Sequence, residues 1–324
     1  SGAYDGILVK YNSSGVRQWH TFFGGSGDDF AFGIDLDPSG NIYISGSSAA
    51  SWGTPLNAFS ADPDGLVIKF NSSGVRQWHT FFGAGFGENA YAIAVDASGN
   101  AYVTGNSQTN WGTPVEPYTG GTDGIVLKYN TSGARQWHSY FGGGNNGDRG
   151  QGIALDASNN VYITGFSGQS WGSPIVAPAG GSDGIVAKYN GSTGDLVWNT
   201  YFGSSGADEG RNVVLDASGN IYVTGQAAAT WGTPISAYSS AIDGALVKLN
   251  SSGVRQWNTF LGGTGDDIGY GVAADGTGNM YITGSSTATW GTPINAYASG
   301  GDGFVAKYNS SGARQFHTFF GGTG

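Results

Sequence analysis

Cysteine is absent from this chain of 324 residues, and charged residues make up only 11% of it. The absence of cysteine excludes disulfides, thiol catalysis and cysteine-ligated metals, but it leaves the compartment open. Basic residues are scarce as well, since 13 Lys and Arg face 23 Asp and Glu, for a net charge of −10. A nucleic-acid partner requires a basic face, so we expect none. No apolar run reaches the length of a membrane span.

Glycine and aromatic residues are abundant, with 60 Gly and 14% aromatic residues. This profile differs from that of disordered chains, which contain few aromatic residues. A segment that begins Asp-Gly and ends near Phe-Gly recurs six times, starting at Asp5, Asp64, Asp123, Asp183, Asp243 and Asp302. The regular spacing indicates a repeat architecture, in which each unit buries its apolar faces against its neighbours.

One repeat contains four short segments that are separated by turns and loops. The segments cover 89–96, 101–104, 124–129 and 134–141. Ala97-Ser-Gly-Asn100 lies between the first two segments, and Asn130-Thr-Ser-Gly133 lies between the last two, as is typical of tight hairpin turns. Four antiparallel strands without helical periodicity predict the blade of an all-β propeller. We therefore expect a single β-propeller domain over residues 1–324, with repeats near residues 5, 64, 123, 183, 243 and 302.

The string Tyr91-Ala-Ile-Ala-Val-Asp-Ala-Ser-Gly-Asn-Ala-Tyr-Val-Thr-Gly105 resembles the SBBP β-propeller repeat and, more distantly, the NHL repeat. Asp216–Gly225 carries the same pattern. The resemblance covers essentially the whole chain. It implies a propeller fold and no shared reaction, and it favours an exported or surface protein of a microbe.

The hairpins of the two kinds differ in number. The first hairpin of a repeat, which we call the inner hairpin, occurs around Asp37, Asp96, Asp156, Asp216 and Asp275. The second, or outer, hairpin occurs six times. The sequence thus predicts five complete blades and an N-terminal two-stranded half blade over residues 5–23. An added inner hairpin would complete a six-bladed ring; the alternatives are a fragment, a gapped ring, or completion by another chain through strand addition.

An acid precedes the first strand of every complete blade, at Asp29, Glu88, Asp148, Asp208 and Asp267. Carboxylates that converge at the mouth of a propeller channel could bind Ca²⁺, which is the one cofactor we consider. The alternative is that each carboxylate accepts hydrogen bonds from backbone N–H groups of the glycine loop beside it. That alternative is favoured, because the dense acidic spacing of a dedicated calcium loop is missing.

A Trp-Gly-Thr-Pro or Trp-Gly-Ser-Pro motif follows each inner hairpin, at Trp52, Trp111, Trp171, Trp231 and Trp290. These loops are expected on the same face as the acids, where indole rings and carboxylates could form a glycan-binding face. The favoured alternative is that each indole fixes a long loop to a blade, since tryptophan is highly buried on average. Within the outer hairpins we expect Arg76 to stack on Trp78, and Lys69 to bond an acid of the next blade.

Histidines at 20, 79, 138 and 317 become Asn199 and Asn258 in the other two copies. Asparagine replaces histidine as a hydrogen-bonding group but not as a general base or zinc ligand, so catalysis at these positions is not expected. More generally, an active site requires an acid, a base or a nucleophile to gather in one pocket, whereas these polar residues recur in nearly every copy. We therefore expect no enzyme.

The expected function is that of a noncatalytic, exported scaffold that acts by protein contact and assembles into a surface or extracellular fibre or matrix. Its expected partners are other protein chains, including copies of itself, and its expected location is extracellular or at the cell surface. The alternative is a lectin-like or cation-dependent module that binds a glycan with the face that carries the Trp loops and the acids.

Overall fold

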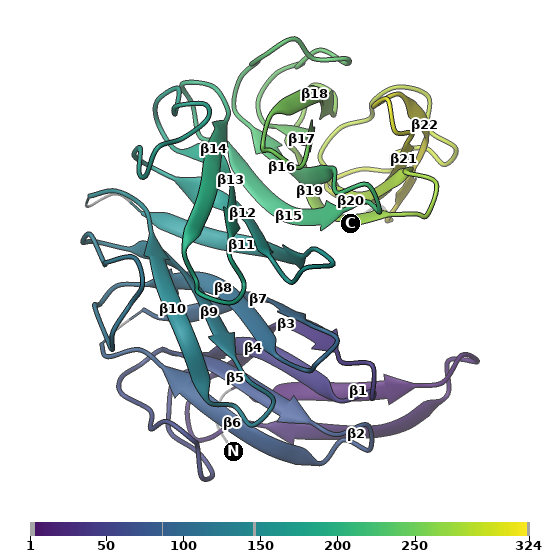
Figure 1. Cartoon of the computed structure of the whole chain (residues 1–324). Helices are drawn as coiled ribbons and strands as arrows, with labels where there is room; N and C mark the ends of the chain where they lie inside the picture. The colour runs from purple at the N-terminus through teal and green to yellow at the C-terminus, as the bar shows by residue number, and fades with distance from the viewer. Residues whose placement is uncertain (1–3, 86, 145–146, 323–324) are drawn as a thin grey trace. The chain divides into compact units, whose positions relative to one another are not determined.

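The computed structural model describes residues 4–85, 87–144 and 147–322. Over these residues the chain is all-β, with five four-stranded sheets and one two-stranded sheet (Figure 1). No helix that could cross a lipid bilayer occurs in the described part of the chain. The prediction of five propeller blades and an N-terminal half blade is confirmed.

The half blade contains β1 (Gly6–Tyr11) and β2 (Arg17–Phe23). Blade 1 contains β3 (Asp29–Leu36), β4 (Ile42–Ser48), β5 (Asp64–Phe70) and β6 (Arg76–Phe82). Blade 2 contains β7 (Asn89–Val95), β8 (Ala101–Ser107), β9 (Asp123–Tyr129) and β10 (Arg135–Phe141). Blade 3 contains β11 (Asp148–Leu155), β12 (Val161–Ser167), β13 (Asp183–Tyr189) and β14 (Leu196–Phe202). Blade 4 contains β15 (Glu209–Leu215), β16 (Ile221–Ala227), β17 (Asp243–Leu249) and β18 (Arg255–Leu261). Blade 5 contains β19 (Asp267–Ala274), β20 (Met280–Ser286), β21 (Asp302–Tyr308) and β22 (Arg314–Phe320).

The chain divides into two compact units. Residues 1–161 and 190–195 form the first unit, which holds the half blade, blades 1 and 2, and β11. Residues 162–189 and 196–324 form the second unit, which holds β13, β14, most of β12, and blades 4 and 5. A single domain over residues 1–324 stays a prediction.

In blades 1 to 4 the two central strands are buried on both faces, whereas in blade 5 they are only partly buried. Every residue of β4, β8 and β16 is buried, and β5, β9 and β17 each have one partly exposed residue. Strands β4, β8 and β16 begin with apolar residues and end with small polar residues and glycine, so they do not alternate between an apolar and a polar face. In the half blade, by contrast, β1 is buried at only two of its six positions.

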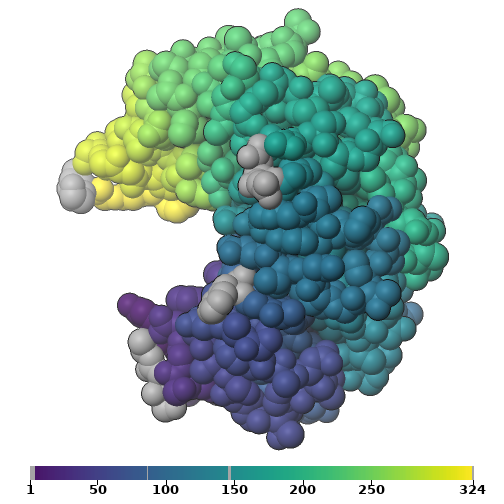
Figure 2. All heavy atoms as spheres, turned by 90° about the vertical axis from the view of Figure 1, so that its left-hand side faces the viewer, coloured from purple at the N-terminus to yellow at the C-terminus, as the bar shows by residue number. Residues whose placement is uncertain are grey.

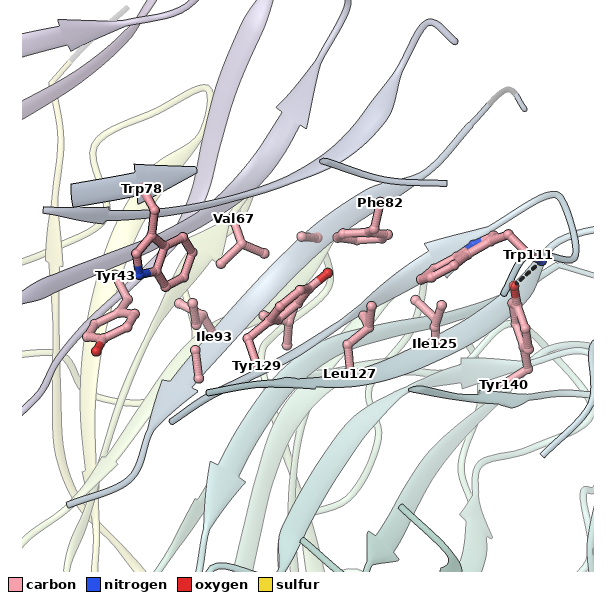
Figure 3. Close-up of a cluster of buried hydrophobic side chains, with 13 residues drawn as sticks. Tyr43, Val67, Trp78, Phe82, Ile93, Trp111, Ile125, Leu127, Tyr129 and Tyr140 are labelled. Atoms are coloured by element: carbon pink, nitrogen blue, oxygen red, sulfur yellow. Dashed lines mark hydrogen bonds between the residues drawn. The ribbon is translucent and has the colours of Figure 1, made fainter. Parts of the chain in front are cut away.

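Neighbouring blades meet through a layer of large apolar side chains (Figure 3). Trp78 and Phe82 of blade 1 belong to one buried cluster with Ile125 and Tyr129 of blade 2. In every outer hairpin except that of blade 4, which has Leu261 instead, a glycine lies beneath a phenylalanine ring. A Cβ atom on Gly65, for example, would lie 2.1 Å from Phe82 Cζ. This contact explains why glycine follows the first aspartate of the repeat.

The inner turn is built as its residue types predict. Asp37 Oδ1 accepts hydrogen bonds from the backbone N–H of Ser39 and Asn41, both at 2.9 Å. Gly40 has a φ of 76°, a conformation that glycine adopts without strain. The turn also joins blades, since the Tyr43 hydroxyl donates to the carbonyl of Gly99 in the next blade at 2.9 Å.

Candidate functional site

The five predicted acids are buried at the start of the first strand of each blade: Asp29, Glu88, Asp148, Asp208 and Asp267. Their hydrogen bonds go to loops nearby. Asp208 Oδ2 accepts from the N–H and the hydroxyl of Ser204, at 2.7 and 2.8 Å. Asp29 and Asp267 accept from the N–H of Gly25 and Gly263, at 2.7 and 2.9 Å. These backbone contacts agree with the alternative in which each carboxylate accepts hydrogen bonds from the glycine loop beside it.

A second carboxylate from the preceding blade approaches the acid at the junctions beside Gly83 and Gly203, which sequence reasoning missed. A Cβ atom on Gly83 would lie 2.8 Å from Glu88 Oε2 and 3.0 Å from Asp64 Oδ1. Its counterpart on Gly203 would lie 2.6 Å from Asp183 Oδ1 and 2.9 Å from Asp208 Oδ2. The regular spacing of the aspartate that opens each outer hairpin was the signal for this pairing.

Burial makes Glu88 and Asp183 weaker acids. Burial raises the pKa of Glu88 to about 7, and the nearby charge of Asp64 adds to the shift against the hydrogen bonds from Thr109 and Ser107. Burial likewise raises the pKa of Asp183 to about 6, with a contribution from Asp208. Two buried carboxylates in proximity cannot both ionise without cost, so one proton is retained more readily.

A shared calcium ion would require several of these acids to converge. Among the described residues, no group of three or more His, Asp or Glu side chains is positioned to hold a metal ion. Each acid instead belongs to its own junction. A calcium-binding role for Asp29, Glu88, Asp148, Asp208 and Asp267 stays a prediction.

The tryptophans of the loops serve as packing elements. Trp52, Trp111, Trp231 and Trp290 are buried, and Trp171 is partly buried. The Trp52 ring stacks on His79 at 4.0 Å, and the Arg76 guanidinium lies over its ring at 5.0 Å. An indole held in this way fixes its loop to the outer hairpin of its own blade. A glycan-binding role for these five residues stays a prediction.

The histidines complete this stack by hydrogen bonding. His79 Nε2 lies 2.8 Å from the backbone carbonyl of Trp52, and His138 Nε2 lies 2.9 Å from that of Trp111. Asn258 makes the same contact, since its Nδ2 donates to the carbonyl of Trp231 at 3.1 Å. The exchange of histidine for asparagine between repeats is explained by this shared donor.

The half blade presents the same stacking surface, and no tryptophan loop of the described residues covers it. Phe22 is 60% exposed, whereas its counterpart Phe81 is 1% exposed. His20 is exposed as well, yet its ring meets Phe22 edge-on at 5.7 Å, as His79 meets Phe81 at 5.5 Å. We call the side chains of Arg17, His20 and Phe22 the open shelf. The rings of His20 and Phe22 thus keep the arrangement seen in blade 1, although no described loop covers them.

An apolar face of blade 1 adjoins the half blade. Ile34 and Leu36 of β3 are 59% and 56% exposed, whereas the counterpart of Ile34 in blade 2, Ile93, is 7% exposed. In blade 2 this face is covered because β7 packs against β3 and β4 of the preceding blade. Within the described residues β1 pairs with β2 alone. The purple N-terminal residues lie at an outer surface of the first unit (Figure 2).

Aromatic rings form a row in the first unit, in which Tyr4, Phe30 and Phe32 are exposed and Tyr91 is partly buried. Tyr4, Phe30, Phe32 and Tyr91 follow one another with ring centroids 6.2, 6.1 and 5.3 Å apart. Sequence reasoning missed this row. The signal was present, because Phe30 stands where Asn89, Arg149 and Glu209 stand in the next three repeats.

Known proteins resemble this chain at several levels. Regulatory protein FlaEY of Caulobacter vibrioides is 23% identical over 369 aligned residues, which cover all of this chain and 38% of FlaEY. The chain therefore spans less than half of that relative. An ulvan lyase, which is a polysaccharide lyase, has a TM-score of 0.48 at 11% identity, over 92% of this chain and 71% of the lyase. A DUF4221 protein of Bacteroides vulgatus has a TM-score of 0.42 at 10% identity, over 98% of this chain and 87% of that protein. Scores of this size carry no information about activity.

The repeats themselves match a family. The SBBP family model, described as a β-propeller repeat, matches residues 18–51, 77–110, 136–168, 197–230 and 256–289. Each match runs from the last strand of one blade through the inner hairpin of the next. The matches together cover about half of the chain and recur in all five complete blades, and the chain therefore belongs to the SBBP β-propeller repeat family.

Proposed function

We propose that this chain is a noncatalytic scaffold that acts by protein contact, and that the half blade is its contact surface. The observation that carries the proposal is that a free strand edge, an uncovered apolar face and the open shelf lie together in the first unit. Free edges of this kind pair with strands of other chains. The Caulobacter relative is named as a regulatory protein, which agrees with action by contact.

The complete blades indicate what the contact surface accepts. There, an inner hairpin pairs with the first strand of the outer hairpin, and a Trp loop then covers the arginine, the histidine and the aromatic ring. The partner would therefore supply a β-hairpin followed by an aromatic residue. Main-chain hydrogen bonds would provide affinity, and the indole on the open shelf would provide specificity.

A labelled peptide with the sequence of residues 267–297, which contains an inner hairpin and its Trp loop, tests this surface. Fluorescence anisotropy should show saturable binding that weakens at least tenfold when Trp290 of the peptide is replaced by alanine. Phe22→Ser in the protein should have a similar effect. Val75→Ser is the matched control, because Val75 is also exposed but lies in an outer turn of blade 1. An affinity that is unchanged by both Trp290→Ala and Phe22→Ser would refute the proposed surface.

We further propose that the protein works outside the cell and assembles into a fibre or matrix. The support is its SBBP repeat family together with an edge that is open to another chain. Electron microscopy of unfixed purified protein tests assembly, and fractionation of the source cells tests location. Filaments that disappear in an Ile34→Ser/Leu36→Ser variant are expected; isolated particles at every concentration would contradict self-assembly.

A lectin-like or cation-dependent binding module is the second candidate. The row of Tyr4, Phe30, Phe32 and Tyr91 favours it, because the first three rings are exposed and aromatic faces can stack on sugar rings. A glycan array probed with and without Ca²⁺ tests this candidate. Binding that is lost in Phe32→Ala would support it, and an array without any bound glycan would eliminate it.

A further inference from the structure

Neighbouring blades meet through two different faces. In blade 1, Val67 and Phe82 lie on the face that packs against the next blade, which we call the leading face. In blade 2, Ile125 and Tyr129 lie on the face that packs against the preceding blade, which we call the receiving face (Figure 3). The corresponding residues of blades 4 and 5 form one buried cluster in the same way. A leading face and a receiving face are thus the two halves of one junction.

The leading face of blade 5 is exposed in the second unit. Phe320 is 58% exposed, whereas its counterpart Phe82 is 4% exposed. Val305 is partly exposed, whereas its counterpart Val67 is fully buried. Strand β21 alternates between buried and partly exposed residues, because its other face packs against blade 4. Blade 5 therefore presents one half of a junction.

The receiving face of the half blade is exposed in the first unit. Ile7 and Tyr11 are 51% and 58% exposed, whereas their counterparts Ile125 and Tyr129 are fully buried. Exposed apolar surface of this kind is typical of interaction sites. One chain thus presents both halves of the junction that it builds between its own blades.

The outer turn beside a receiving face makes specific contacts with the preceding blade. In blade 2 the carbonyl of Thr131 accepts hydrogen bonds from Lys69 Nζ at 3.3 Å and from Trp78 Nε1 at 3.0 Å. A Cβ atom on Gly133 of the same turn would lie 2.8 Å from the Trp78 ring. In the half blade the counterpart of this glycine is Gly15, and no described atom lies within 4 Å of a Cβ atom added there. The outer turn of the half blade therefore has space for a ring from another blade.

We propose that the leading face of blade 5 docks onto the receiving face of the half blade in a second copy of this chain. Lys307 donates to the carbonyl of Ser13. Phe316 lies over Gly15, at the position that an indole occupies in the junction of blades 1 and 2. The contact is head to tail, so it repeats from copy to copy. This inference rests on the proposed function and names the surface of the chain that serves as the partner.

The residue at position 316 makes this junction weaker than those inside the chain. Tryptophan occupies the same position in the other five outer hairpins, at Trp19, Trp78, Trp137, Trp198 and Trp257. Phe316 covers the glycine, but it has no N–H to donate to the carbonyl as Trp78 does. The loss of one hydrogen bond suits a contact that forms and breaks between copies.

Sedimentation velocity of the full chain over a range of concentrations measures this association. We expect particles that grow with concentration. Phe316→Trp restores the hydrogen bond and should lower the dissociation constant roughly fivefold. Val305→Asp should abolish association, because it places a charge in an apolar contact. Val197→Asp is the matched control, since Val197 of β14 is also exposed. A wild-type chain that stays monomeric at every concentration would overturn the proposal.

Cross-linking separates docking of a second copy from closure of one chain on itself. The chain has no cysteine, so a short bismaleimide links only thiols that are introduced. Ser13→Cys/Lys307→Cys should give a ladder of linked chains on a denaturing gel, whereas Ser13→Cys/Val197→Cys should give none. Linked monomers without a ladder would overturn the proposal, because the occupant would then be the same chain.

The peptide assay of the open shelf keeps this inference distinct from the proposed function. Binding of the peptide without association between chains would overturn the docking of blade 5 alone. Association that is lost in Val305→Asp, without any binding of the peptide, would support the docking of blade 5 and overturn the open shelf as a contact surface.

Discussion

At the scale of single residues, the buried carboxylate pairs predict how stability changes with pH. The folded state holds a proton on Glu88 up to about pH 7, whereas an unfolded glutamate loses it near pH 4.3. Because the folded chain binds more protons in this interval, the free energy of unfolding falls as pH rises through it and is level above it.

Glu88→Gln should remove this part of the pH dependence, since the amide imitates the protonated acid. We expect the variant to gain about 1–3 kcal/mol over wild type above pH 7 and to match it near pH 4. Urea denaturation across this range measures the difference. Asp195→Asn, at an exposed aspartate, is the control and should run parallel to wild type. A constant offset between Glu88→Gln and wild type would contradict the prediction.

The glycine beneath each phenylalanine gives a second prediction at this scale. Gly65→Ala would bring its Cβ to 2.1 Å from Phe82 Cζ, so the ring must move within a buried cluster. We expect a loss of about 1–3 kcal/mol in the free energy of unfolding, as for other overpacked cores. Gly276→Ala is the matched control, because nothing lies within 4 Å of its added methyl group. Equal stability of the two variants would show that the Phe82 ring moves aside without a loss in the free energy of unfolding.

At the scale of elements, the stack of tryptophan and histidine predicts which substitutions a loop tolerates. His79→Asn keeps a donor for the carbonyl of Trp52, as Asn258 does for Trp231, and should change the free energy of unfolding by less than about 1 kcal/mol. His79→Leu leaves that buried carbonyl without its donor and should cost about 1–3 kcal/mol. Thermal unfolding compares the two, and a leucine variant as stable as wild type would refute this role.

The elements also show what the sequence could and could not predict. Hairpins, turns and blade number follow from local turn chemistry and the repeat period, and they are found as expected. The contacts that side chains make with residues of other loops cannot be predicted in this way. Arg76 was expected over Trp78 of its own strand but lies over Trp52 of the preceding loop. Lys69 was expected to meet an acid and instead donates to the carbonyl of Thr131 in the next blade, at 3.3 Å. These contacts depend on how a long loop folds back, which repeat spacing does not specify.

At the scale of the whole molecule, the blades predict a profile of hydrogen exchange along the chain. The strands β5, β9 and β17 occupy equivalent positions to β1, but each is hydrogen-bonded on both sides. Amides of β1 should exchange far faster than those of these three strands, because one edge is open and the strand is poorly buried. Mass spectrometry after brief deuterium labelling measures the profile. Slow exchange in β1 would indicate that its edge is already paired in solution.

The hydrogen bond from Tyr43 to Gly99 joins blade 1 to the inner turn of blade 2. The carboxylate pairs also bring together side chains of successive blades. Junctions between different blades therefore share contacts of the same kind. A gene that encodes such a chain can gain or lose one unit by unequal recombination without creating a junction of a new kind. Blade number is thus open to change in a single genetic step, whereas a change within one junction requires two compensating mutations in different repeats.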